Sequence, residues 1–340
     1  HPRIRQDLPQ GGAAPVAVAP CFRRFRAPVA SPLSLRPVVH RRPARATTSM
    51  IERILGIIVP VFSIIALGYF YGRRAQPDMG WVNRISMNVL APALIFSALS
   101  AKSFDVIDNR LLILGSIGVV LGSGLLAWPF TRLLHQDHRT FVPPMMFNNC
   151  GNMGLPLAAL AFGQTGFSAM VALFTISNLL HFTLGSWMID HHARFGNLLK
   201  NPMVWSTFAG FAFALLHPPL PDIAAITFRM VGDALIPMML LSLGVRLTSI
   251  RWDDARIGVI GGLVCPLTGI AMAALLSPVL GLDKEQQGLL ILFGCLPPAV
   301  LNFMVAEQFK QEPGKVASIV LIGNVLSVIF VPIGLSLALH

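Results

Sequence analysis

The chain has 340 residues, of which 54% are hydrophobic and only 12% are charged, and its mean hydropathy is +0.67. Because about 25% of residues are charged in an average soluble domain, this composition excludes a water-soluble globular protein and predicts a polytopic membrane protein. The formal net charge of +11 does not predict a nucleic-acid partner, since most of it lies in one amino-terminal segment.

Residues 1–49 contain nine Arg, one Asp and eight Pro. This segment cannot bury enough apolar surface to fold, so we expect it to be disordered and basic. Met50 directly precedes an apolar helix pattern and is a natural start for a membrane protein. We therefore interpret residues 1–49 as an extension that is not native. An Arg-rich organellar transit peptide and a tail that binds nucleic acid or lipid are the alternatives.

Apolar windows of about 20 residues predict ten membrane-spanning helices in an all-α fold. The second window is the weakest, because Arg84, Asn88 and Pro92 interrupt it. The windows centre on Ile64, Leu94, Gly122, Cys150, Leu173, Ala212, Leu240, Gly269, Ala299 and Leu326.

Two of these windows are interrupted by polar residues, Gly and Pro. The first interruption is Phe147–Pro156, with the sequence FNNCGNMGLP, and the second is Gly294–Asn302, with the sequence GCLPPAVLN. Hydrocarbon offers no water to backbone groups, so a broken helix persists there only where it lines a polar cavity or is covered by protein. Broken helices of this kind form the binding sites of transporters.

The two halves of the chain repeat each other. A shift of 145 residues places Arg84 on Arg229, Pro92 on Pro237 and Cys150 on Cys295, and a shift of 146 places Asn178 on Asn324. The predicted helices one to five then fall on six to ten. Because five is odd, the halves must cross the membrane in opposite directions. We predict an inverted repeat of residues 50–193 and 194–340, in which broken helices four and nine cross.

Lys and Arg are unequally divided between the two sides of the predicted topology. The odd-numbered connections contain twelve of them and the opposite side contains five. Because positive residues favour the cytoplasmic side, we expect both termini to lie outside the cytoplasm.

The broken helices predict an anion site. Pro156 suits the first turn of a new helix, and Pro297 or Pro298 can do the same in the second half, because Pro lacks an N–H that would be unsatisfied there. Each new helix then directs about half a positive charge at the membrane centre. Neither interruption contains a charged residue, so we expect an anion site without Lys or Arg.

Four Asn residues lie in the interruptions: Asn148, Asn149, Asn152 and Asn302. Their amides either contact the substrate or cap loose backbone at the breaks, and we expect Asn149 and Asn302 to do both. Gly154 allows a close helix crossing. We place it in the predicted substrate site with Pro156, Pro297 and Pro298.

Asp233 is the one acid predicted well inside a helix. An intramembrane carboxylate is a candidate for proton coupling or cation binding, and a simple ion pair with Arg229, four residues earlier, is the alternative. We expect Asn178 and Asn324 to form hydrogen bonds between helices. His181 and the run Asp190–His192 do not form the H-E-x-x-H arrangement, so we expect no metal site and no cofactor.

Two motifs, Asn149-x-x-x-x-Gly154-x-Pro156 and Leu296-Pro297-x-x-x-x-x-Phe303, together with the ten-helix duplication, resemble the auxin efflux carrier family. This family includes plant PIN-type carriers and bacterial relatives. The resemblance covers residues 50–340. The short connection between the halves resembles that of a bacterial member, which implies the inner membrane.

The resemblance implies a scaffold of helices one, two, six and seven, and a moving transport unit of helices three to five and eight to ten. It implies organic anions as substrates, including auxin in plants and malate or malonate in bacteria, framed by Asn149, Pro156 and the Pro297 region. One position departs from the family: Asn302 stands where PIN-type carriers have a second Pro. The second break should therefore lie near Pro297, and auxin specificity is not supported.

We therefore predict a secondary carrier that exports or exchanges small organic anions by alternating access. The alternative within the same fold is a sodium-coupled bile-acid-type symporter, which would favour acids at the crossing. A membrane enzyme or receptor is a different class, but no catalytic motif or soluble output domain supports it. The expected partners are the anion, the lipid bilayer and a proton or sodium ion, and a homodimer stays open.

Overall fold

The computed structural model describes residues 49–101, 104–191, 202–216, 218, 220–248 and 254–340. The basic segment that we predict to be disordered lies outside the described residues, except for Ser49. The described residues are helical, with extended pairing limited to one isolated bridge between Asn148 and Pro298. The all-α prediction is confirmed for this part of the chain.

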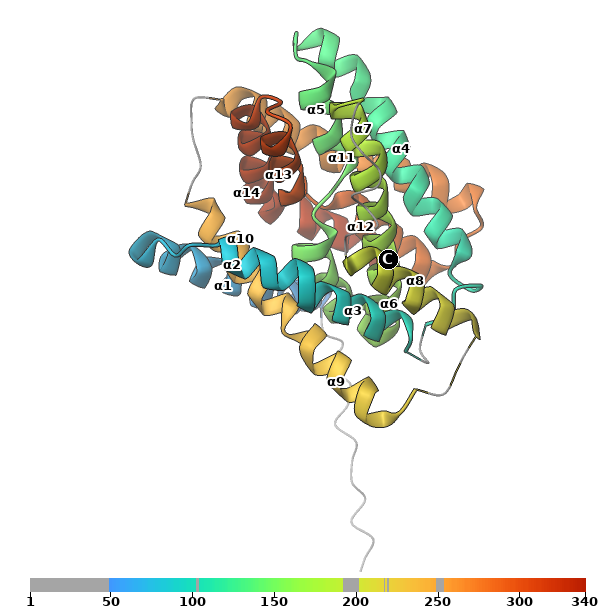
Figure 1. The fold of residues 1–340 in the computed structure, drawn as a ribbon. Coiled ribbons are helices and arrows are strands. Elements are labelled where there is room, and N and C mark those ends of the chain that lie inside the picture. Colours follow the sequence, from blue (N-terminus) through green and yellow to red (C-terminus); the bar gives the residue numbers. More distant parts are fainter. Residues whose placement is uncertain (1–48, 102–103, 192–201, 217, 219, 249–253) are drawn as a thin grey trace, which may run out of the picture. The chain divides into compact units, whose positions relative to one another are not determined.

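Figure 1 shows the helices in chain order. The α-helices are α1 (Met50–Ala75), α2 (Gly80–Ile85), α3 (Ala91–Leu99), α4 (Arg110–Leu133), α5 (His138–Met146), α6 (Leu155–Leu180), α7 (Ser186–Ile189), α8 (Pro202–Leu216), α9 (Asp222–Asp233), α10 (Leu235–Leu247), α11 (Ala255–Val279), α12 (Lys284–Cys295), α13 (Val300–Gln308) and α14 (Pro313–Ala338). Three π-helical turns join some of them: η1 (Ser86–Leu90), η2 (Cys150–Gly154) and η3 (His181–Gly185).

Seven helical segments in the described residues are long and apolar enough to span a membrane, against the ten that we predicted. The fourth and fifth predicted helices form one segment, Cys150–Ile189, although Gly163 breaks its helical path with a φ of 69°. The ninth is divided into α12, of 12 residues, and α13, of 9. The sixth, α8, has only 15 residues. The ten-helix inverted repeat therefore stays a prediction.

In two of the π-helical turns, η1 and η2, one residue separates the end of the turn from a proline, since Ala91 and Leu155 each lie between the turn and that proline. Ala91 N–H bonds to the carbonyl of Ser86, and Leu155 N–H bonds to that of Cys150. Pro92 and Pro156 follow directly. A proline ring crowds the carbonyl four residues earlier and offers no N–H, and a wider turn relieves that crowding.

The second predicted helix, Gly80–Leu99, has the lowest mean hydropathy of the seven segments, 1.3. This agrees with the prediction that it is the weakest of the apolar windows.

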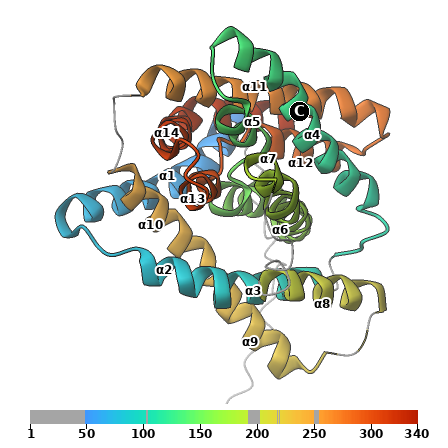
Figure 2. The ribbon, with the colours of Figure 1, turned by 45° about the horizontal axis from the view of Figure 1, so that its top comes forward.

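The helices pack most extensively in two sets. In the first set, α1 packs along α10, and α3 packs on α8 and α9. Gly68 and Gly244 allow the close approach of α1 and α10, since a Cβ on Gly244 would lie 2.0 Å from the carbonyl oxygen of Ile65. In the second set, α11 packs on α14, α12 and α4, and α4 packs on α5. Figure 2 shows α13 beside α5 and α14 of this set.

Most of the largest fully buried side chains lie on the broken helices, including Phe141, Phe147, Met153 and Phe293, and the others lie on α3 and α4. Large apolar side chains are exposed on the outer helix faces. On α14, Val325, Val328 and Ile329 form one such face at helical spacing. This distribution is expected where lipid rather than water covers the surface.

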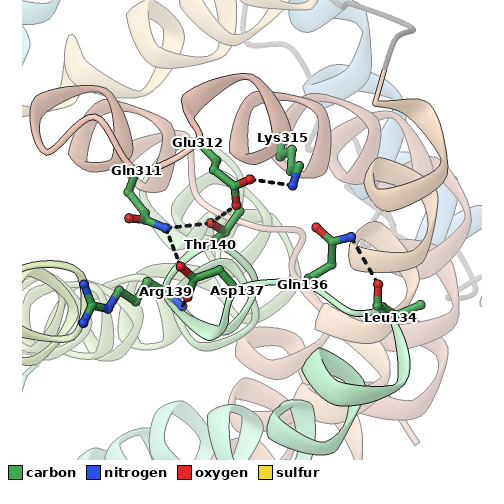
Figure 3. Close-up of polar contacts among 8 residues, drawn as sticks. All are labelled: Leu134, Gln136, Asp137, Arg139, Thr140, Gln311, Glu312 and Lys315. Atoms are coloured by element: carbon green, nitrogen blue, oxygen red, sulfur yellow. Dashed lines mark hydrogen bonds and ion pairs between the residues drawn. The ribbon is translucent and has the colours of Figure 1, made fainter.

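A polar network joins the start of α5 to the start of α14 (Figure 3). Thr140 donates to Glu312 at 2.6 Å, and Lys315 pairs with Glu312 at 2.5 Å. Gln311 donates to Asp137 at 3.0 Å and to Thr140 at 3.1 Å. Burial alone would raise the pKa of Glu312, but hydrogen bonds from Lys315 and Thr140 outweigh it and hold the pKa below its ordinary value. Glu312 is therefore ionised at neutral pH and maintains the link.

Candidate functional site

The two broken helices meet through their extended breaks. Phe147 follows α5 in an extended conformation, and Leu296 and Ala299 are extended between α12 and α13. Asn149 N–H donates to the carbonyl of Pro297 at 2.7 Å, and Ala299 N–H donates to that of Phe147 at 2.9 Å. The resulting bridge is antiparallel, so the two chains run in opposite directions where they pair.

The bridge pairs Asn148 with Pro298, which are 150 positions apart rather than the 145 of the sequence repeat. The repeat alignment therefore misses the second break by a few residues. Pro298 occupies a bridge position that exchanges no hydrogen bonds with its partner, because those bonds come from the neighbouring residues. A residue without an N–H is tolerated at such a position.

Buried side-chain amides brace this crossing. Asn302 donates to the carbonyls of Phe147, at 2.8 Å, and Ala299, at 3.0 Å. Asn148 donates to the carbonyl of Phe293. Asn302 is 1% exposed and Asn148 is 5% exposed. These contacts cap backbone carbonyls at the breaks. Capping was one of the two roles that we predicted for the amides, and substrate contact was the other.

Hydrogen bonds of Asn149 and Asn324 extend this network of side-chain amides into α14. Asn149 donates to the side-chain oxygen of Asn324 at 2.7 Å, and Asn324 donates to the carbonyl of Pro298 at 3.0 Å. Asn324 thus joins both broken helices to the helix that follows them. Asn178, which our repeat alignment pairs with it, has no side-chain hydrogen bond in the described structure and lines a cavity instead.

Each break is followed by a new helical start. The helical path after the first break begins with Cys150, and Pro156 lies in its second turn, as the second residue of α6. After the second break α13 begins at Val300. The prediction that Pro297 or Pro298 occupies the first turn is therefore wrong, because both residues lie in the extended segment before it. The expectation that this break lies near Pro297 is confirmed.

Both new helical starts face one cavity of about 60 Å³, which Gly151 and Asn152 line from one side and Val300 and Leu301 from the other. The first N–H groups of a helix have no intrahelical acceptor, so both starts offer free donors there. The polar lining residues are Asn83, Ser86, Asn148, Asn149, Asn152, Asn178, Ser242 and Arg246, and the apolar ones include Met87, Met203, Met239, Met304, Phe174 and Phe182.

The cavity brings together only some of the predicted site residues. Asn148, Asn149 and Asn152 line it, and Asn178 joins them. The other predicted residues lie behind the wall: Gly154, Pro156, Pro297, Pro298 and Asn302. At Gly154 a Cβ would lie 2.8 Å from a methyl carbon of Leu296, so Gly154 permits the close contact between the two broken helices.

Sequence reasoning missed several polar cavity residues, namely Asn83, Ser86, Ser242 and Arg246, and of these Arg246 is the charged one. It follows an apolar run, so we counted it as part of a connection. It lies in the last turn of α10, four residues after Ser242 and seven after Met239, and this spacing puts all three on the face that lines the cavity. The cavity that we take as the candidate site therefore includes one Arg, whereas we expected an anion site without Lys or Arg.

Asp233 lies elsewhere. It lines a separate cavity with Leu94, Ser97 and Gln164, and its carboxylate is 3.7 Å from Arg229, with the two side chains 61% and 70% exposed. The structure thus contains the ion pair that we held as the alternative. A coupling role for Asp233 stays a prediction.

His181 packs behind the crossing. Its ring stacks on Phe147 at a centroid distance of 4.1 Å, and it is 2% exposed. No group of three metal-ligating side chains is found in the described part of the chain. The run Asp190–His192 ends outside the described residues.

Comparison with known proteins places the chain among transporters. A family model described as "Membrane transport protein" matches residues 53–196 and 195–335. A Rhizobium meliloti protein named "Putative malonate transporter" is 28% identical over 81% of this chain and 92% of its own length. An "Uncharacterized transporter" of Methanothermobacter thermautotrophicus is 26% identical over 83% and 96%. "Auxin efflux carrier component 6" of Arabidopsis thaliana is 23% identical over 38% of this chain and 24% of its own.

Proposed function

This chain belongs to the membrane transport protein family, and from that premise we propose that it is a secondary carrier of small organic anions. The observation that carries the proposal is the convergence of two helical starts on one cavity beneath the crossing. Among the described lining residues there is no Asp or Glu, so nothing in that wall opposes an anion.

The electrostatics of the two starts favour a carboxylate. Each helix start has a partial positive charge of about half a unit, and an anion beside it gains about 0.3–1 kcal/mol, or up to about 2 kcal/mol where water is excluded. Two starts facing one ligand add their effects, and the amide of Asn152, which lines the cavity at 7% exposed, adds a neutral donor. Carboxylate oxygens accept such hydrogen bonds.

The packing supports alternating access. The first set of helices corresponds to the scaffold that the family resemblance implies. The second set contains the first half of each broken helix, α5 and α12, and corresponds to the transport unit. Residues of both sets line the cavity, Met239 and Ser242 from α10 and Asn149 and Gly151 from the crossing. A rocking or elevator-like movement of one set against the other would expose such a ligand to either side.

A second candidate is a sodium-coupled symporter. Its support is the pair of side-chain oxygens on Asn148 and Asn302, which are buried and accept no hydrogen bond in the described structure. Oxygen atoms are the ligands that hard cations take in proteins. The lack of a carboxylate in the described cavity wall makes this the weaker candidate.

For the membrane, we propose the bacterial inner membrane with both termini outside the cytoplasm. The orientation is supported by the excess of Lys and Arg in one set of connections. The inner membrane is supported by the short connection between the halves, which resembles that of bacterial members. A homodimer stays a prediction.

Counterflow in proteoliposomes tests the carrier proposal. Purified protein would be reconstituted and loaded with unlabelled malonate, malate, succinate or indole-3-acetate, and uptake of labelled malonate would be followed with and without sodium. We expect exchange by the short dicarboxylates, independent of sodium. Exchange only in sodium would favour the symporter, and no exchange of any carboxylate would reject the carrier proposal.

A further inference from the structure

Arg246 is held in place by the packing of its own helix. The residues just before it, Gly244 and Val245, pack against α1, where Val245 Cα lies within 3.0 Å of a Cβ placed on Gly72. A helix so closely packed against its neighbour cannot easily rotate. The face of α10 that presents Arg246 to the cavity is therefore fixed by backbone packing.

The guanidinium of Arg246 has no hydrogen-bond or ion-pair partner in the described part of the chain. The charge of Glu307 on α13 acts on it electrostatically, but no contact within ion-pair distance joins the two side chains. Arg246 itself is half-buried. A half-buried guanidinium that lines a cavity, with five donors and no acceptor among the described residues, is suited to a planar anion such as a carboxylate.

The cavity wall therefore has positive groups from two different parts of the fold. The helical starts and the amide of Asn152 belong to the broken helices, whereas Arg246 belongs to α10, which contacts the turn Cys150–Gly154 directly. The same wall also contains apolar side chains, among them Met87, Met239 and Met304. A ligand that satisfies this wall has an anionic group at each end and a short apolar middle.

The size of the cavity limits that ligand. A site needs about 10–15 Å³ by the same measure to hold one water, so about 60 Å³ holds roughly four to six groups of water size. A dicarboxylate of three or four carbons lies slightly above this size and an aromatic acid such as indole-3-acetate lies far above it, so the dicarboxylate requires the smaller opening of the cavity.

We propose that Arg246 binds the second carboxylate of a short dicarboxylate whose first carboxylate lies at the crossing, and thereby selects dicarboxylates over monocarboxylates. This inference rests on the proposed carrier function. It also assigns one end of the substrate to each packing set, so that the bound ligand bridges the scaffold and the transport unit.

The test compares malonate with acetate in wild type, Arg246→Gln, Arg246→Lys and the control Arg132→Gln. Arg132 is an exposed residue in the last turn of α4 and does not line the cavity. The readout is the concentration of each unlabelled acid that half-inhibits uptake of labelled malonate, or of labelled acetate where malonate uptake is too low. Size-exclusion chromatography would verify that each variant is folded.

We expect Arg246→Gln to weaken malonate about 10- to 100-fold, the usual effect of losing a hydrogen bond between charged groups, and to change acetate less than about 3-fold. Arg246→Lys should retain part of the preference, because its charge remains but its planar fork does not. Arg132→Gln should match wild type.

An unchanged ratio of malonate to acetate in Arg246→Gln would overturn the inference, as would an equal loss of both acids in folded protein. If Arg246→Gln does not fold, Arg246→Lys decides: a smaller preference for malonate over acetate supports the inference, and an unchanged preference overturns it. Failure of the carrier function itself is distinguishable, because wild type would then exchange neither acid.

Discussion

Replacing Asn302 with Ala is expected to reduce malonate counterflow at least about tenfold and to lower the free energy of unfolding by about 2–3 kcal/mol. The side chain donates to the carbonyls of Phe147 and Ala299 from a position that is 1% exposed. Each net hydrogen bond contributes about 0.5–1.5 kcal/mol, and the truncated side chain leaves a small void. Transport falls because the brace that directs both helical starts into the cavity loosens.

Asn109→Ala is the matched control for this variant. The Asn109 side chain also donates to a backbone carbonyl, that of Asp105 at 2.8 Å, but it does so at the start of α4 rather than at the crossing. Thermal unfolding in detergent and counterflow would be measured side by side. If Asn302→Ala transported like Asn109→Ala, the crossing would not depend on this amide.

Gly269→Ala should have the largest effect on folding. A Cβ on Gly269, in α11, would lie 2.0 Å from the carbonyl oxygen of Gly294, in α12, and 3.0 Å from its Cα. These are backbone atoms, so α12 itself must move, and overpacking of this kind typically costs about 1–3 kcal/mol and occasionally more. Gly294 lies two residues before the extended Leu296, so the movement would also displace the crossing.

The measurement is the yield of monodisperse protein together with its thermal midpoint. Gly56→Ala serves as the control, because no atom lies within 4 Å of a Cβ placed on Gly56 and Ala is favoured over Gly inside a helix by about 1 kcal/mol. We expect Gly56→Ala to be at least as stable as wild type. Equal stability of both variants would show that α11 and α12 are not in close contact.

The breaks were predictable from sequence because their chemistry is local. Gly, Pro and Asn within an apolar window cannot continue an ordinary membrane helix, and the structure has extended residues at Phe147 and between Leu296 and Ala299. The exact starts of the new helices were less predictable. Whether Pro297 lies in the first turn or before it depends on how the two segments pair, and this pairing is not encoded by either segment alone.

The roles of the amides depend on tertiary contacts. Asn152 and Asn302 look alike in sequence, since both follow a break by a few residues. In the structure Asn152 lines the cavity, whereas Asn302 turns back to the carbonyl of Phe147, 155 positions away. No local pattern separates a ligand-facing amide from a bracing one when the acceptor is so distant.

Arg246 shows that the position of a charged residue in the sequence does not by itself indicate whether the residue lines a cavity. A Lys or Arg at the end of an apolar run is usually a marker of orientation, and we counted it so. Its spacing from Met239 and Ser242 was the available signal, but this signal gains meaning only when that face of α10 is known to line the cavity.

The most direct test of whether this cavity holds the transported anion is substrate protection of a cysteine at Asn178, a half-buried lining residue. In a variant without the native cysteines, Asn178→Cys would be alkylated in proteoliposomes at increasing malonate, with Ser97→Cys, in the separate Asp233 cavity, as the reference. We predict that malonate slows labelling of Asn178→Cys only, saturating at the concentration that saturates counterflow. Active counterflow with unchanged labelling at Asn178→Cys would contradict the assignment of this cavity.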